Sequence, residues 1–164
     1  MKILLKLTLF FVALLCVSCS SSLVYKDRMA ANSNVVLTDL DLFREDVWTN
    51  LDVKVRDFHA LNKRVNAPKG YDLLVLKFGI TNYSEEKVVI DLAKFLIKIK
   101  DKYHPPVDQN SWNKDIWKIR LGEKSSKTSR NVITLNLVYV IKKGEHPSEI
   151  VLGRFGTLAI PNNW

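Results

Sequence analysis

Three histidines are the side chains in this chain of 164 residues best suited to metal binding or acid–base catalysis. They stand alone in the sequence, at His59, His104 and His146. None has a second histidine four residues away or lies in an H-E-x-x-H frame, the spacing that places two zinc ligands on one helix face. The G-x-S-x-G turn of serine hydrolases is also missing. We therefore expect a protein that is not an enzyme and that holds no metal or cofactor.

The acidic residues leave one alternative open. Asp39, Asp41 and Asp46 suggest calcium through their D-x-D spacing, but the glycine and the final glutamate of an EF-hand loop are missing. Glu85 and Glu86 are typical of a solvent-exposed turn. Carboxylates that cleave glycosides are recognised by their separation in space, which a sequence does not give. An enzyme whose site is assembled from scattered residues therefore remains an alternative.

The first residues have the layout of a secretory signal. Lys2 and Lys6 precede an unbroken apolar run from Leu7 to Val17, and small residues follow it. This run is too short to cross a bilayer, which takes about 20 apolar residues. We expect residues 1–18 to be an N-terminal signal helix that is removed on export.

The residues after the apolar run specify the kind of signal. Cys16-Val17-Ser18-Cys19-Ser20 resembles the lipobox of bacterial lipoproteins, with cysteine where leucine is common three positions before Cys19. The resemblance implies that Cys19 carries a diacylglyceryl thioether and a further acyl chain, such as palmitate, on its new amino group. Two or three chains anchor a protein durably, whereas one does so only marginally. The alternative is a plain export signal in which Cys19 is incidental.

Composition bounds the exported part of the chain. Loss of residues 1–18 leaves 146 of the 164 residues and lowers the net charge from +8 to +6. That length suits one domain, and we expect a tether over residues 19–35 and a domain over residues 36–164. Cys16 leaves with the signal, so no disulfide forms. The basic charge suggests a membrane or an envelope polymer as neighbour rather than nucleic acid.

Apolar residues alternate with polar ones in several short segments, which is the pattern of half-buried strands. Expected strands cover residues 51–61, 71–82, 88–90, 95–102, 132–141 and 150–160, whereas residues 36–44 fit either a short helix or a strand. Residues 71–82 are apolar on both faces and should form a central strand. Residues 107–120 form an insert that could hold a short helix. This pattern predicts an all-β protein, an antiparallel two-sheet sandwich.

Several of these segments resemble one family. Lys69–Asn82 is similar to the K-G-x-φ-φ-x-φ-x-φ-x-φ-x-N strand of a bacterial domain family of unknown function, whose members are sometimes mislabelled as telomeric-repeat-binding-like. Asp91–Tyr103, Leu121–Lys124 and Leu137–Gly144 are similar to three later motifs, without the proline of the last two. The resemblance covers roughly residues 51–158. It implies an immunoglobulin-like domain on an exported lipoprotein and brings no catalytic residues.

Two surfaces are candidates for contact with a partner. Lys94, Lys98, Lys100 and Lys102 alternate along one expected strand, and this lysine row could face anionic lipid or polymer, or simply solvent. Trp112 and Trp117 lie in the insert and could contact a protein or glycan, or instead cap the core.

We therefore expect a lipid-anchored envelope lipoprotein with a binding or structural domain. An alternative is an inhibitor or accessory subunit of an envelope enzyme that presents a loop such as residues 107–120. By resemblance to enterobacterial sorting, Ser20 after the lipidated cysteine allows passage to an outer membrane.

Overall fold

The computed structural model describes residues 22–25, 29–32, 34–53, 60–109, 117–125, 131–162 and 164. The expected signal helix, Cys19, His59 and Trp112 lie outside these residues. In the described part of the chain, no helix has the length and apolar character needed to cross a membrane. The regular elements are antiparallel strands and two short 3-10 helices, which confirms the all-β prediction.

The elements follow one another along the chain in this order: β1 (Leu23–Tyr25), β2 (Met29–Asn32), β3 (Val35–Glu45), β4 (Val47–Val53), β5 (Ala60–Asn66), β6 (Tyr71–Asn82), β7 (Val88–Asp91), η1 (Leu92–Lys94), β8 (Phe95–Ile99), β9 (Lys102–His104), β10 (Asp108–Gln109), β11 (Lys118–Leu121), β12 (Val132–Lys142), β13 (Glu149–Leu152), η2 (Gly153–Phe155) and β14 (Thr157–Ala159).

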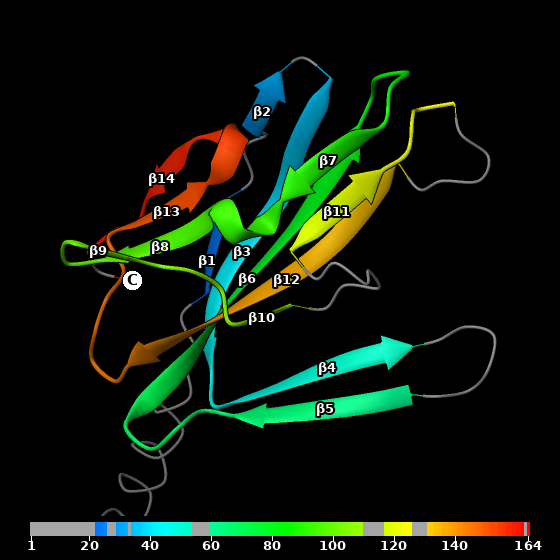
Figure 1. The fold of residues 1–164 in the computed structure, drawn as a ribbon. Helices are drawn as coiled ribbons and strands as arrows, with labels where there is room; N and C mark the ends of the chain where they lie inside the picture. The colour runs from blue at the N-terminus through cyan, green and yellow to red at the C-terminus, as the bar shows by residue number, and fades with distance from the viewer. Residues whose placement is uncertain are drawn as a thin grey trace, which may run out of the picture.

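The largest sheet is built on β6, whose bounds match the predicted central strand. Its order is β1-β3-β6-β12-β10, and β2 also pairs with β3. Leu42, Leu76 and Leu137 lie opposite one another across the three long strands. Figure 1 shows these strands crossing the molecule from lower left to upper right.

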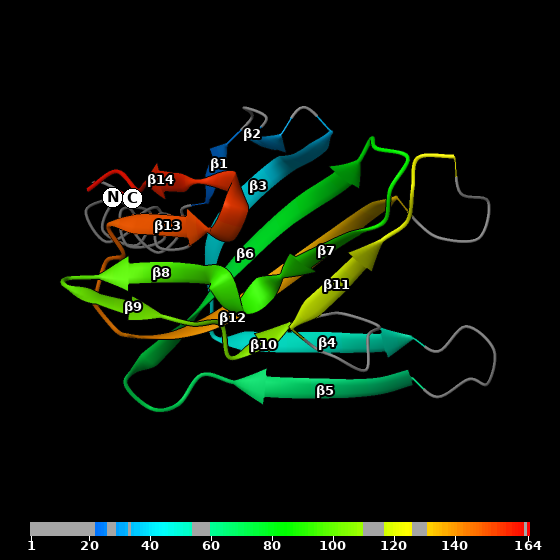
Figure 2. The ribbon, with the colours of Figure 1, turned by 45° about the horizontal axis from the view of Figure 1, so that its top comes forward.

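The main core lies on one face of this sheet. The even-numbered apolar residues of β6, Leu74 to Ile80, are fully buried there, as the alternation predicts. The opposing layer consists of β14-β13-β8-β9 and the pair β11-β7 (Figure 2). Phe78 of β6 stacks on Phe95 of β8 with ring centroids 5.1 Å apart, so aromatic contact joins the two layers.

The opposite face of the sheet carries a second, smaller core. Leu73 and Val75 of β6 and Val138 of β12 are buried there together with Trp48 of β4. Trp48 begins the β4–β5 hairpin, which extends away from the sheet (Figure 1). This second cluster explains why β6 is apolar on both faces.

Two predicted strands are in fact pairs of strands. Residues 51–61 were expected to form one strand, but they cover the end of β4 and the start of β5, which pair from Val47↔Asn66 to Val53↔Ala60. Residues 150–160 were expected to form one bulged strand. There the chain turns through η2, where Gly153 (φ 57°) and Gly156 (φ 105°) adopt left-handed backbone angles, and β14 folds back on β13.

The predicted strand over residues 95–102 also divides. β8 ends at Ile99, Lys100 takes a left-handed φ of 55°, and β9 returns antiparallel to β8. The ambiguous residues 36–44 belong to strand β3. In the insert, the described residues include β10 and most of β11. The expected helix was to extend to Ile119, which lies in β11, so the prediction was wrong at that end, and residues 110–116 lie outside the described part.

The chain enters the fold earlier than the expected tether allows. Within residues 19–35, β1 pairs with β3 through Leu23↔Leu42 and Tyr25↔Leu40, and β2 pairs with β3 beyond it. Leu23 and Tyr25 pack against the main core, and the Tyr25 hydroxyl donates a hydrogen bond to the Ala159 carbonyl. The reason for this difference is that Leu23 and Tyr25 lie on the same side of β1. They give this short segment of a polar stretch an apolar side to bury.

Candidate functional site

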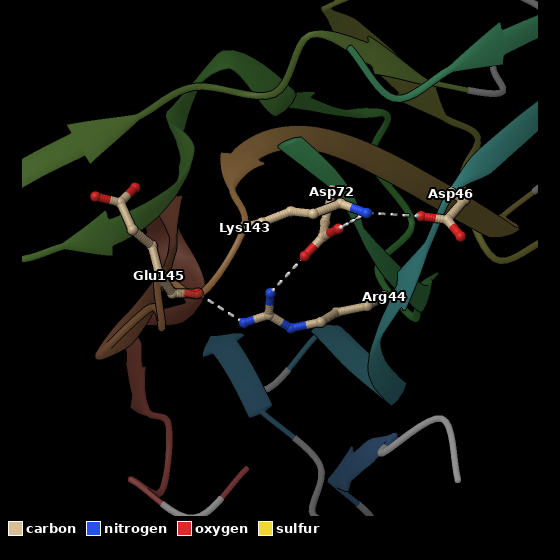
Figure 3. Close-up of polar contacts among 5 residues, drawn as sticks. All are labelled: Arg44, Asp46, Asp72, Lys143 and Glu145. Carbon is tan, nitrogen blue, oxygen red and sulfur yellow. Dashed lines mark hydrogen bonds and ion pairs between the residues drawn. The ribbon is translucent and has the colours of Figure 1, made fainter. Parts of the chain in front are cut away.

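A cluster of charged side chains closes one end of the main core (Figure 3). Arg44 of β3 is 3.1 Å from Asp72 of β6, Nη1 to Oδ2, and its Nη2 donates to the Glu145 carbonyl at 2.7 Å. Lys143 approaches Asp72 at 3.6 Å and Asp46 at 3.8 Å. The cluster thus fastens the start of β6 to the end of β3 and to the turn between β12 and β13.

The C-terminal residue joins the same cluster. The Arg44 guanidinium lies 5.2 Å from the centre of the Trp164 ring, a cation–π arrangement. The side chains of Arg44 and Asp72 are only 23% and 19% exposed, so each charge has lost much of its hydration and is compensated by the other. Because its charges are matched and its hydrogen bonds hold strands together, this cluster is a structural element.

A hollow of about 420 Å³ lies on the far face of the large sheet, beyond Trp48 and its neighbours. Its lining residues come from three adjacent strands: Val24, Tyr25, Asp39, Asp41 and Lys77. The register places Val24, Asp41 and Lys77 in one row across β1, β3 and β6. The hollow therefore combines two carboxylates and one ammonium group from adjacent strands.

A bulge in β3 shapes the hollow. The pairing of β3 with β6 shifts between Thr38 and Asp41, and Asp39 takes a left-handed φ of 54°. Aspartate tolerates that conformation better than most residues. Gly79 of β6 lies opposite, where an added Cβ would come within 3.0 Å of the Thr38 hydroxyl. The bulge therefore needs a glycine across from it, and it turns two carboxylates of one strand toward the hollow.

The hollow has the means to hold a small polar group. The Oδ1 atom of Asp41 is buried and has no hydrogen-bond partner in the described part of the chain, so an unsatisfied acceptor lies beside the hollow. Lys77 supplies the opposite charge beside it. This arrangement suits a ligand group that both donates and accepts hydrogen bonds. It contains no nucleophile with an adjacent base.

The three aspartates of the D-x-D segment do not come together. Asp39 and Asp41 line the hollow, whereas Asp46 belongs to the Arg44 cluster. Of the histidines, His104 is half-buried in β9 and His146 is exposed after β12. Within the described residues, no three histidine, cysteine, aspartate or glutamate side chains are arranged to hold a metal ion.

The structure divides the predicted lysine row. Lys94 ends η1, Lys98 lies in β8, Lys100 is in the turn, and Lys102 begins β9, so they do not line one strand face. Lys98 is 3.8 Å from Glu149 and Lys100 is 2.9 Å from Glu145, so both are ion-paired. The prediction of one face was wrong because the turn at Lys100 reverses the chain.

The predicted tryptophan pair is described only in part. Trp117 is half-buried and packs against the main core beside β11, which favours its capping role over contact with a partner. Trp112 and the lipidation residue Cys19 lie outside the described residues, so those two site predictions stay predictions.

The sequence reading missed the hollow although it contained a signal. Lys77 interrupts an otherwise buried stretch of β6, and a charge at such a position indicates either an ion pair or an open surface. Asp39 and Asp41 were considered only as calcium ligands. Their partnership with Lys77 depends on strand register, which the sequence does not specify.

Comparison of the chain with protein-family models, with curated proteins and with solved structures finds no match.

Proposed function

We propose that this protein is a lipid-anchored lipoprotein of the bacterial cell envelope whose β domain acts by binding or as a structural part. The observation that carries the proposal is Cys19, which follows a short apolar run and Ser18 and lies three residues before the described fold begins at Ser22. Acyl chains on that sulfur and on the new amino group would hold the domain at a membrane surface.

The domain is well suited to a scaffold role. Its main core joins two antiparallel layers without a disulfide, and most large side chains of β6 and β12 are fully buried. We propose an immunoglobulin-like arrangement for these layers, which the motif resemblance over residues 51–158 suggests. Such sandwiches present loops and faces as binding surfaces.

The hollow beside Asp41 and Lys77 is the surface that we propose for ligand contact. Its carboxylates and its lysine would select a partner that carries both donor and acceptor groups, such as a peptide or an envelope polymer. Crosslinking in the native envelope should capture a partner with the unchanged protein and lose it with Asp41→Asn and Lys77→Gln. The exposed Lys87→Gln serves as the control. Capture that is unchanged in both hollow variants would remove this site from the proposal.

Lipidation is tested by labelling with palmitate in the native host. The unchanged protein should carry label, and Cys19→Ala should lose it. Cys16→Ala is a matched control, because that cysteine leaves with the signal and the label should stay. Label retained by Cys19→Ala, or lost by Cys16→Ala alone, would contradict the proposed anchor.

A further inference from the structure

The position of β1 limits where an acylated Cys19 can lie. Cys19 and Ser22 are separated by three peptide units, which span at most about 11 Å when fully extended. Leu23 lies opposite Leu42, and through it Leu76 and Leu137, so the chain enters along the edge of the large sheet, level with the middle of its long strands. A bilayer that holds the acyl chains must therefore pass close to the domain.

The two ends of the large sheet are not equally close to this entry point. β6 and β12 pair from Tyr71↔Lys142 to Thr81↔Val132, which corresponds to about 34 Å along the strands. Ser22 is roughly 14 Å from the level of Lys142 and about 24 Å from the level of Asn82. Because β1 is antiparallel to β3, its N-terminal end also points toward Glu45 and Lys142. A link of at most about 11 Å brings Cys19 to within about 3 Å of the level of Lys142, whereas it leaves Cys19 at least about 13 Å short of the level of Asn82.

The nearer end is rich in exposed lysines, and we call it the lysine end. It consists of the turns before β6, between β8 and β9, and after β12, which share one side of the molecule (Figures 1 and 2). The exposed lysines of this end are Lys69, Lys100, Lys102, Lys142 and Lys143. The backbone bond from Lys143 to Gly70 and the Lys100–Glu145 ion pair hold these turns together.

Not all of this positive charge is neutralised. Lys69, Lys102 and Lys142 form no ion pair with the described part of the chain, whereas Lys100 and Lys143 do, and the exposed Asp101 offsets one of the three unpaired lysines. Tyr71 and Tyr103 are 41% and 51% exposed at the same end. Tyrosine and lysine together are typical of surfaces that rest at the headgroup level of a bilayer.

The opposite end has a different charge. Its loops after β6 and after β11 carry three acidic residues, Glu85, Glu86 and Glu123, and two basic ones, Lys87 and Lys124. These loops are joined by the bonds from Lys124 to Ser84 and from Ser125 to Glu85. An anionic membrane attracts lysines that lie near its surface, so it would attract the lysine end and would not attract this one.

We propose that the lysine end rests on an anionic phospholipid bilayer once Cys19 is acylated. This inference rests on the proposed lipid anchor and adds the orientation of the domain. The opposite end, with its glutamate loops, then points away from the membrane, and the hollow beside Asp41 faces sideways above the lipid surface, open to a partner.

The test uses the lipidated full-length protein in vesicles of phosphatidylglycerol with a nitroxide-headgroup quencher. After maturation the acylated Cys19 is not a free thiol, so an introduced cysteine is the single site for a fluorophore. His146→Cys reports on the lysine end and Glu86→Cys on the opposite end, and both positions are exposed. We expect quenching at least twofold stronger at residue 146. Equal quenching, or stronger quenching at residue 86, would overturn the orientation.

Charge variants separate attraction by lysine from simple tethering. Replacing Lys69, Lys102 and Lys142 with glutamine should reduce the quenching at residue 146 about twofold. The matched replacement of Lys87, Lys94 and Lys124 should leave it unchanged. The mass of the N-terminal peptide is measured on the same samples: an unacylated Cys19 overturns the lipoprotein proposal itself, whereas an acylated Cys19 with weak quenching at both labels overturns only the orientation.

Discussion

Tyr139 of β12 donates its hydroxyl to the carbonyl oxygen of Phe95 in β8, at 3.1 Å, and so joins the two layers by a hydrogen bond inside the main core. The ring is fully buried, and burial raises the pKa of the hydroxyl well above its usual value. This shift favours the protonated phenol, which is the form that donates the hydrogen bond.

Loss of this hydroxyl should weaken the protein without changing its fold. Tyr139→Phe keeps the ring and leaves the Phe95 carbonyl buried without this donor, which costs about 1–3 kcal/mol of unfolding free energy. Urea denaturation followed by circular dichroism measures this cost. Tyr103→Phe is the control, because that tyrosine is half exposed and should change stability by less than about 0.5 kcal/mol. Equal effects of the two variants would refute the special role of Tyr139.

The Arg44–Asp72 pair should show strong coupling for a salt bridge. Both side chains are largely covered, and Asp72 also lies 3.6 Å from Lys143. In a double-mutant cycle with Arg44→Met and Asp72→Asn, we expect a coupling energy of about 1–2 kcal/mol, because each single change leaves a covered charge. The exposed pair Lys143–Asp46 should couple by less than about 0.5 kcal/mol. A coupling no larger than that of the exposed pair would show that water screens the cluster.

Asn82 should be among the most sensitive polar positions. It is completely buried, and its Nδ2 donates to the carbonyls of Glu86 and Gly122 at 2.7 and 2.9 Å. Its Oδ1 accepts from Ser84, both from the amide and from the hydroxyl. Asn82→Asp removes both donors and places a carboxylate beside two carbonyl oxygens. We expect a loss of about 2–4 kcal/mol.

Ser84→Ala provides the comparison for Asn82. It removes the hydroxyl's bond to the same Oδ1 atom and its exposed contacts with the Glu86 backbone, all of them neutral, so it should cost only about 0.5–1.5 kcal/mol. Thermal and urea unfolding of both variants check the order. If Asn82→Asp were as mild as Ser84→Ala, the buried amide would not be what fixes the loops after β6 and β11.

Glu145 should contribute a pH-dependent part of the stability. Its hydrogen bond from Lys100, with the neighbouring positive charge, holds the pKa of the Glu145 carboxyl below its ordinary value of 4.5. A lowered pKa in the folded state stabilises the protein above pH 4.5, and this gain is lost as the pH falls through the folded value. Lys100→Gln should therefore be less stable than the unchanged protein near neutral pH, with the difference vanishing in acid.

Unfolding measured from about pH 7 to about pH 3 tests this dependence. Lys102→Gln is the control, because Lys102 has no ion pair with the described residues, and its stability should follow that of the unchanged protein. A Lys100→Gln deficit that stays constant with pH would mean that packing of the lysine stem, and not the charge of Glu145, is responsible.

The sequence by itself determined the class of fold and its central strand. The alternation in residues 71–82 and 132–141 gave the faces of β6 and β12 correctly, because the period of a strand is a local property. The prediction of a lipobox at Cys19 is equally local, since a signal is recognised as an extended segment before folding, and it stays a prediction. Both predictions use only neighbouring residues.

Tertiary structure decided where the chain reverses and which charges meet. Residues 51–61 and 95–102 each contain a reversal that alternation alone does not reveal, since the apolar pattern resumes on the returning strand. The hollow arises because register brings Asp41 opposite Lys77, and the lysine end arises because three separate turns meet at one side of the sheet. Such contacts join residues that are distant in sequence. They form only when the strands pair, so no single segment of the chain indicates them.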